Sequence, residues 1–188
     1  VYYIVPKQSE LKEKIKDYDM VLCGLGLTFN AEVISGTKKL KSITTATTGL
    51  DHIDLKAAEK HGVKVLSLKG EDEFLNGITG TAELALGLMI SLARHIPSSI
   101  TSVLKGEWDR ESFKGHSLRG QTLGVVGLGR LGRWMAGYGE SLGMRVIYVD
   151  PNVESKNPKW KKVKIDQLLK ESDFISIHVH LSPETEYM

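Results

Sequence analysis

The sequence is poor in cysteine and in net charge, and each shortage excludes a class of protein. Its one cysteine, Cys23, rules out an internal disulfide and a cysteine cluster that holds a metal. Twenty-five basic and 23 acidic residues are interspersed and give a net charge of +2, which leaves no electrostatic footprint for nucleic acid. We therefore expect a cytoplasmic protein that has no nucleic-acid partner.

Long hydrophobic runs are also missing. The longest, residues 84–93, is interrupted by Ser91 and is too short to span a bilayer. Residues 1–5 are apolar but lack the basic flank of a signal peptide. We expect no membrane partner, and we interpret residues 84–93 as part of a helix that is buried on most sides.

What the chain does contain is an alternation of short apolar strands and helices. The first half predicts strands at 2–5, 20–23, near Ile43 and at 63–66, and helices at 10–16, 31–35 and 54–61. The second half predicts strands at 122–126, 144–149, 163–165 and 174–179, and helices at 81–92, 98–105, 131–142 and 166–170. Such alternation is typical of parallel α/β sheets. The pattern restarts near residues 71–80, which predicts domains at 1–75 and 76–188.

The most informative stretch is residues 122–150. An apolar strand runs directly into a glycine motif, Gly127-x-Gly129-x-x-Gly132, and a helix whose apolar residues recur at three- and four-residue spacing follows. A second strand then ends on Asp150. The apolar positions of that helix predict a buried face formed by Leu131, Met135, Tyr138 and Leu142.

Each part of this stretch has a physical reason to bind a dinucleotide. Gly127 permits the tight turn, Gly129 leaves room for a pyrophosphate, and Gly132 lets the helix approach the strand. The N–H groups at the helix start face the phosphates, and Asp150 accepts hydrogen bonds from a ribose. A 2′-phosphate would meet the Asp150 carboxylate instead, so the sequence predicts NAD rather than NADP, although Lys156 and Lys159 could soften that repulsion.

Two other patterns are weaker. Gly24-Leu25-Gly26 follows a strand but lacks a third glycine, so it is better interpreted as a loop that lines a cleft. His178 and His180 share one face of a strand without a third ligand nearby, so we predict no metal site.

The helix predicted at 81–92 is apolar nearly all round, unlike a surface helix. It must therefore pack on its own sheet and on a second surface. Pro97 is expected to break or kink it. We take a homodimer as the default assembly.

Several motifs together resemble the D-isomer-specific 2-hydroxyacid dehydrogenases, the family of D-3-phosphoglycerate dehydrogenase. The resemblance runs in order from about residue 10 to the end. It is carried by TGLDHID at 48–54, TAELALG at 81–87, LARHIP at 92–97, GEW at 106–108, FKG at 113–115, residues 118–132, Asp150-Pro151, residues 168–169 and 172–174, His178 and SPET at 182–185.

The resemblance implies part of a flavodoxin-like substrate domain followed by an incomplete Rossmann-like, doubly wound parallel sheet. It implies hydride exchange between NAD and a small 2-hydroxy or 2-keto acid. Its implied cofactor contacts, besides the glycines, are Arg130, Leu131, Asp150, Pro151, Val179, His180, Thr48 and Thr81. The backbone N–H groups of Thr48, Gly49 and Leu50 would bind the substrate carboxylate.

Two departures from the family pattern qualify this expectation. The family's catalytic arginine, glutamate and histidine follow the strand near His178, and the sequence stops at Met188 before any of them. We expect these residues to be a piece of a longer enzyme that is inactive alone. Gly24 stands where phosphoglycerate enzymes have a basic residue, so a phosphorylated substrate is less assured.

A second class of function fits the same features. Relatives of this fold also serve as transcriptional co-repressors, so a non-catalytic, dimeric NAD-sensing module is the alternative to the dehydrogenase.

Overall fold

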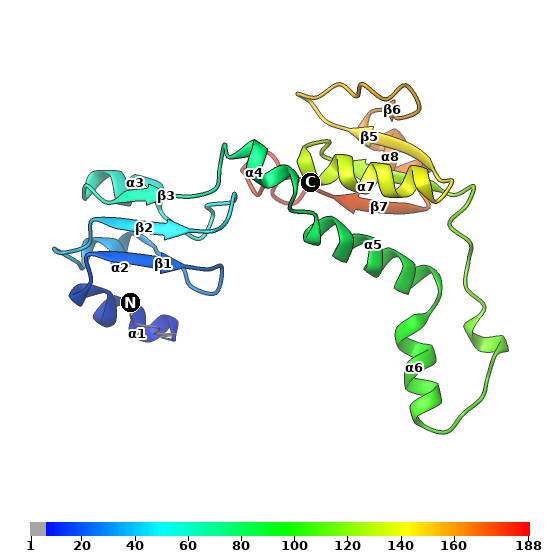
Figure 1. Cartoon of the computed structure of the whole chain (residues 1–188), viewed down its shortest axis with the longest axis horizontal. Coiled ribbons are helices and arrows are strands. Elements are labelled where there is room, and N and C mark those ends of the chain that lie inside the picture. Colours follow the sequence, from blue (N-terminus) through cyan, green and yellow to red (C-terminus); the bar gives the residue numbers. More distant parts are fainter. Residues whose placement is uncertain (1–6) are drawn as a thin grey trace. The chain divides into compact units, whose positions relative to one another are not determined.

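The computed structural model describes residues 7–188, and the chain contacts divide it into two units (Figure 1). One comprises Val1–Leu75 together with His180–Met188, and the other is Asn76–Val179. The strand predicted at 2–5 lies outside the described residues. Residues 180–188 group with the first unit, whereas the sequence pattern assigned them to the second.

The first unit is built on a parallel sheet with strand order β1-β2-β3. Its elements are α1 (Gln8–Lys14), the 3₁₀ turn η1 (Ile15–Asp17), β1 (Met20–Cys23), α2 (Ala31–Ser35), β2 (Ser42–Thr45), α3 (Leu55–Lys60) and β3 (Lys64–Leu66). Asp54 caps α3 as predicted, because its Oδ1 accepts a hydrogen bond from the N–H of Ala57 at 2.9 Å. Gly62 follows that helix at φ +68°, a left-handed conformation that suits glycine.

One face of this first sheet carries the core. Cys23 and Ile43 from the strands pack with residues of the three helices and the loops, which are Leu11, Ile15, Phe29, Val33, Ile34, Leu40, Ile53, Ala57, Ala58 and Val63. On the opposite face Leu22 and Leu66 are exposed. Within the described residues, therefore, this sheet is covered on one side only.

The second unit contains the longer helices and a four-stranded parallel sheet. After α4 (Asp72–Asn76), which ends at the boundary, come α5 (Gly80–Ala93), α6 (Ile96–Leu104), the 3₁₀ turn η2 (Glu111–Phe113), β4 (Thr122–Val126), α7 (Arg130–Ser141), β5 (Arg145–Val149), β6 (Lys161–Lys162), α8 (Ile165–Glu171) and β7 (Phe174–Ile177). The strand order is β6-β5-β4-β7. The order reverses between β4 and β7, which is the switch point of a doubly wound sheet.

Both faces of this sheet are covered, which confirms the predicted α/β fold. On one face Leu123, Val125, Val146 and Tyr148 pack with α5 and α7. On the other face Val126 and Ile147 pack with Leu168 of α8. Figure 1 shows α7 lying along the strands with α5 beside it.

The face that α7 buries agrees with the prediction in part, because Met135 is buried and Tyr138 packs against the core as expected. Its buried residues are Gly132, Met135, Ala136 and Gly139, whereas Leu142 is exposed. A Cβ on Gly139 would lie 2.5 Å from a methyl group of Leu123, so the missing side chain is what allows close packing. Apolar spacing alone does not reveal such a contact, because glycine carries no hydrophobic signal.

The third and fourth strands are also displaced from their predicted positions. β6 is two residues long and precedes the predicted strand, and Ile165 begins α8 rather than ending a strand. Val163 still follows the sheet, because its N–H donates to the carbonyl of Tyr148 at 2.9 Å. β7 ends at Ile177, two residues earlier than predicted.

The prediction that residues 84–93 are buried on most sides is wrong for this chain. Ala82, Met89 and Ala93 of α5 are buried, but Leu84, Leu88 and Leu92 are 64%, 57% and 72% exposed. By length and mean hydropathy (1.3), the segment Asp72–Ala93 could cross a membrane. Its helix is nevertheless interrupted at residues 77–79.

The break after α5 comes from His95 rather than Pro97. His95 adopts the left-handed conformation with φ 54°, which ends one helix and starts the next. Pro97 lies in the first turn of α6, where its missing N–H costs no helical hydrogen bond.

Leu168 provides a direct test of this packing. It is fully buried, whereas the adjacent Leu169 is 58% exposed. We expect Leu168→Ala to lower the free energy of unfolding by about 2–5 kcal/mol, and Leu169→Ala to lower it by less than about 1 kcal/mol. Urea unfolding followed by tryptophan fluorescence reports on this unit, because Trp108, Trp134 and Trp160 all lie in it. Equal losses for the two variants would contradict the assigned face of α8.

Candidate nucleotide-binding site

The site is organised by a tight turn between β4 and α7. Gly127 adopts φ +88°, and its N–H donates to the carbonyl of Val149 at 2.8 Å. A Cβ at this position would lie 2.6 Å from the carbonyl oxygen of His178 and 2.8 Å from a methyl group of Val179. Both the conformation and the crowding require glycine.

The other two glycines of the motif have different surroundings. A Cβ on Gly132 would collide with the carbonyl oxygen of Gly127, so this glycine lets α7 close onto the turn. Gly129 is exposed, and a Cβ there would meet no atom within 4 Å. The first N–H groups of α7 follow it directly. This arrangement leaves space for a phosphate beside the positive end of the helix dipole.

Asp150 lies at the mouth of the same turn. Its Oδ2 accepts a hydrogen bond from the N–H of Leu128 at 2.7 Å. Its Oδ1 accepts from the N–H groups of Asn152 at 2.8 Å and Val153 at 2.9 Å. A carboxylate offers about four acceptor positions, so one remains on Oδ2 for a ribose hydroxyl.

The carboxyl end of β7 closes the site from the neighbouring strand. The N–H of His178 donates to the carbonyl of Val126 at 2.7 Å. The Nε2 atom of His178 lies 2.8 Å from the Oγ atom of Ser176. Burial lowers the pKa of the His178 imidazole, which favours its neutral form.

The remaining predicted cofactor contacts are distributed over both units. Arg130 and Leu131 start α7, and the guanidinium of Arg130 donates to the carbonyl of Ile78. Pro151 is exposed next to Asp150. These residues share the second unit with the glycines and Val179, as does Thr81, which is exposed in the first turn of α5.

Thr48 and His180 belong to the first unit. The roles predicted for these two residues, like the other residue roles, stay predictions.

The predicted substrate loop, residues 48–50, is also in the first unit. The Oγ1 atom of Thr47 donates to the carbonyl of Gly49 at 2.8 Å and lies 3.0 Å from the Oγ1 atom of the buried Thr45. Among residues 7–188, no acceptor is paired with the N–H groups of Thr48, Gly49 or Leu50. Unpaired N–H groups in succession suit an anion such as a carboxylate.

The sequence did not predict that Thr45 and Thr47 support the loop at residues 48–50 or that the amide of Leu128 binds Asp150. Thr45 and Thr47 lie in the run TTATT, which has no functional spacing of its own. The Leu128 amide donates to Asp150 from 22 positions away, which no local pattern records.

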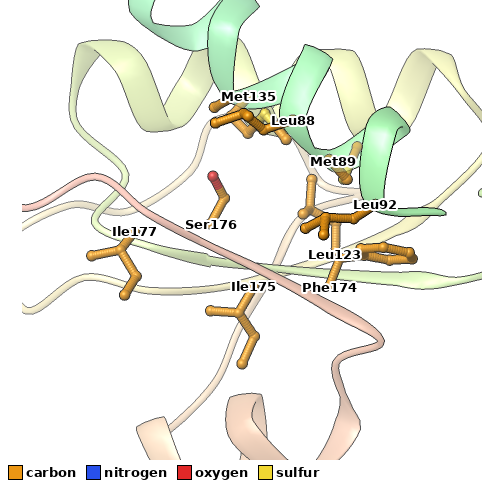
Figure 2. Close-up of a pocket in the computed structure, with 10 residues that line it drawn as sticks. Leu88, Met89, Leu92, Leu123, Met135, Phe174, Ile175, Ser176 and Ile177 are labelled. Carbon is orange, nitrogen blue, oxygen red and sulfur yellow. The ribbon is translucent and has the colours of Figure 1, made fainter. Parts of the chain in front are cut away.

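A separate cavity of about 330 Å³ lies between α5 and β7 (Figure 2). It is lined by Ala85, Leu88, Met89, Leu92, Leu123, Met135, Phe174, Ile175, Ser176 and Ile177, which includes no residue of the glycine turn. Figure 2 shows Ser176 pointing toward α5, whereas Ile175 and Ile177 point to the other side of the strand. In the part of the chain that the structure describes, no group of three or more histidine, cysteine, aspartate or glutamate residues could hold a metal ion.

Comparison with known families assigns both units. Residues 86–188 match the NAD binding domain of the D-isomer specific 2-hydroxyacid dehydrogenases, and residues 1–73 match the catalytic domain of the same family. The chain belongs to this dehydrogenase family. The glycine turn and Asp150 therefore lie in an NAD-binding domain, as the sequence predicts, and the open space at Gly129 fits a dinucleotide.

Individual members of the dehydrogenase family show the same relationship. The chain is 38% identical over 185 residues to D-3-phosphoglycerate dehydrogenase of Methanocaldococcus jannaschii, covering 96% of this chain and 34% of that protein. It is 36% identical over 182 residues to hydroxypyruvate reductase of Thermotoga maritima, covering 97% and 58%. The chain thus spans about a third to somewhat over half the length of these two relatives.

A solved dehydrogenase structure gives the same fold. NAD-dependent formate dehydrogenase from Staphylococcus aureus in complex with NAD superposes with a TM-score of 0.85 at 27% identity, covering 97% of this chain and 55% of that one.

The three motif glycines give separable predictions. Gly129→Ala should leave the free energy of unfolding within about 0.5 kcal/mol of the unaltered value, because nothing lies near the new methyl group, yet weaken NAD binding. Gly132→Ala should lower the free energy of unfolding by about 1–3 kcal/mol through the clash with the turn. Urea unfolding and NAD titration measure the two effects.

Gly137→Ala is the matched control, since it lies on the same helix with open space around it. It should keep NAD binding and gain about 0.5–1 kcal/mol of stability from helix propensity. Loss of stability in Gly129→Ala with unchanged NAD binding would contradict the assigned phosphate position.

Proposed function

We propose that this chain forms the cofactor-binding and part of the substrate-binding portion of an NAD-dependent dehydrogenase acting on a small 2-hydroxy or 2-keto acid. The observation that carries the proposal is the hydrogen bond from the amide of Leu128 to Asp150, next to the open space at Gly129. The family and the names of its members support the reaction class. We further propose that the enzyme is cytoplasmic.

In this proposal the residues of the chain bind the cofactor and the substrate and orient them toward each other. The start of α7 and the exposed Gly129 accept the pyrophosphate, and Asp150 receives the adenosine ribose. Bound NAD supplies a nicotinamide ring that accepts or donates a hydride. The unpaired N–H groups of residues 48–50 hold the substrate carboxylate.

The substrate in this proposal is a small 2-hydroxy or 2-keto acid, and the group on the far side of its reacting carbon is not specified. Gly24 lies beyond the end of β1 and offers no cation for a phosphate. The relatives named above include both a phosphoglycerate and a hydroxypyruvate enzyme. Glyoxylate, hydroxypyruvate and pyruvate are therefore the first compounds to assay.

Binding preference tests the role of Asp150. Because a charge-assisted hydrogen bond contributes about 1.5–3 kcal/mol, we expect NAD to bind at least roughly tenfold more tightly than NADP. Calorimetric titration of both cofactors at millimolar concentration measures the ratio, since we expect weak binding to this chain alone. Equal affinity would remove Asp150 from the ribose contact.

A turnover assay tests whether residues 1–188 contain the catalytic groups or only the groups that bind cofactor and substrate. By the resemblance, the family's catalytic arginine, glutamate and histidine have no counterparts within residues 1–188. We therefore expect no NADH oxidation by this chain with any of the three 2-keto acids above. Measurable turnover would show that the catalytic groups lie within it. No observation on the structure specifically favours the co-repressor alternative.

We also propose that the protein is a homodimer that uses the exposed apolar face of α5 and α6. Leu84, Leu88 and Leu92 on α5 continue into Ile100, Val103 and Leu104 on α6, and all six are more than half exposed. Trp108 follows α6 and is 91% exposed. An apolar surface of this extent is typical of protein interfaces.

A charge placed on this face should prevent association. We expect Leu84→Glu to yield a monomer in multi-angle light scattering, because a second copy cannot bury an unpaired carboxylate. Leu169→Glu is the control, since that leucine is similarly exposed on α8. A monomeric unaltered protein, or binding to lipid vesicles through Asp72–Ala93, would contradict the dimer.

A further inference from the structure

The loop that follows Asp150 is held at its far end by a carboxylate on α7. The Oε2 atom of Glu140 accepts hydrogen bonds from Asn157 Nδ2 at 2.7 Å and from Trp160 Nε1 at 2.8 Å. Its Oε1 atom lies 2.9 Å from Lys159 Nζ. These donors, Lys159 first, lower the pKa of Glu140 and keep it ionised at neutral pH.

Other groups hold the same loop nearer to its start. The carboxylate of Asp150 receives the N–H groups of Asn152 and Val153. The hydroxyl of the fully buried Tyr148 accepts from the N–H of Ser155 at 2.8 Å. The loop is thus held at its start by Asp150, in its middle by Tyr148 and at its end by Glu140.

Two ion pairs also determine whether the nearby lysines can attract a 2′-phosphate. Lys159, which could attract a 2′-phosphate, is paired with Glu140. Lys162 is paired in the same way with Glu154 at 2.7 Å. A 2′-phosphate at this loop would therefore meet the Asp150 carboxylate while Lys159 and Lys162 are engaged in ion pairs, which leaves the exposed Lys156, with no ion pair among the described residues, as the remaining cation of the loop.

We propose that Glu140 is a specificity-determining positioning residue for the cofactor. Its carboxylate fixes loop 151–160 so that Asp150 faces the ribose, and it holds Lys159 away from a 2′-phosphate. This inference rests on the proposed cofactor site. It extends the site from the turn itself to a helix residue ten positions before Asp150.

Nucleotide fragments give the sharpest test, because they contact only this part of the cofactor. Titrations of the full chain with ADP-ribose and with its 2′-phosphorylated form measure two dissociation constants. We expect Glu140→Gln to raise the constant for ADP-ribose about fivefold or more. The constant for the 2′-phosphorylated form should rise less or fall, so the preference for the 2′-hydroxyl narrows. The indole N–H resonance of Trp160 should shift in the same variant.

A second substitution separates specificity from loss of structure. In Glu140→Gln combined with Lys159→Ala, the freed cation is gone, and the preference for the 2′-hydroxyl should widen again. A purely structural role would weaken both ligands equally in both variants, and an unchanged ratio overturns the proposal. Glu171→Gln is the matched control, because it breaks the ion pair between Glu171 at the end of α8 and Arg145 at the start of β5 and should leave both constants unchanged.

The experiment also distinguishes an error in the proposed cofactor site from an error in the role of Glu140. If the unaltered chain binds neither fragment, the nucleotide site is wrong and this inference falls with it. If the unaltered chain prefers ADP-ribose and Glu140→Gln keeps that preference in full, the site stands and only the role of Glu140 is overturned.

Discussion

The hydrogen bond from the amide of Leu128 to the carboxylate of Asp150 joins the ends of two neighbouring strands. It fixes the glycine turn and the acidic group in one geometry before any ligand is present. The carbonyl of Gly127 meets the start of α7 at Gly132, so the turn cannot move without separating helix and sheet. The cofactor site is therefore a consequence of how β4, α7 and β5 pack.

This constraint also explains why Asp150 serves two purposes. Three backbone amides occupy most of its acceptor positions, which keeps a 9% exposed carboxylate satisfied. The remaining position is the one that we propose receives a ribose hydroxyl. Because the loop beyond Asp150 is tied to Tyr148 and Glu140, the preference for a ribose hydroxyl that we propose would be a property of the whole loop.

The glycine turn and the position of Asp150 were predictable from the sequence, because they depend on residues with a strict conformational requirement. Gly127 and Gly132 stand where the turn admits no side chain, and the apolar strands, the helix and Asp150 at the expected offset made the motif specific. Side-chain pairing was not predictable in the same way. Glu140 and Lys159 look like ordinary surface charges in the sequence, which indicated only that Lys156 and Lys159 could soften the repulsion of a 2′-phosphate and not that Lys159 is paired with Glu140. The sequence predicted that α5 packs on a second surface but not whether that surface lies in the same chain, because an apolar helix gives the same pattern whether its partner is the same chain or another.

The most direct test follows the backbone amides of residues 127–132 and 150–153 by heteronuclear NMR during titration with ADP-ribose. The account predicts that these resonances shift together, with the largest changes at Gly129 and Arg130, where the phosphates approach the start of α7. Saturable binding that leaves these amides unmoved and shifts those lining the cavity between α5 and β7 would contradict it.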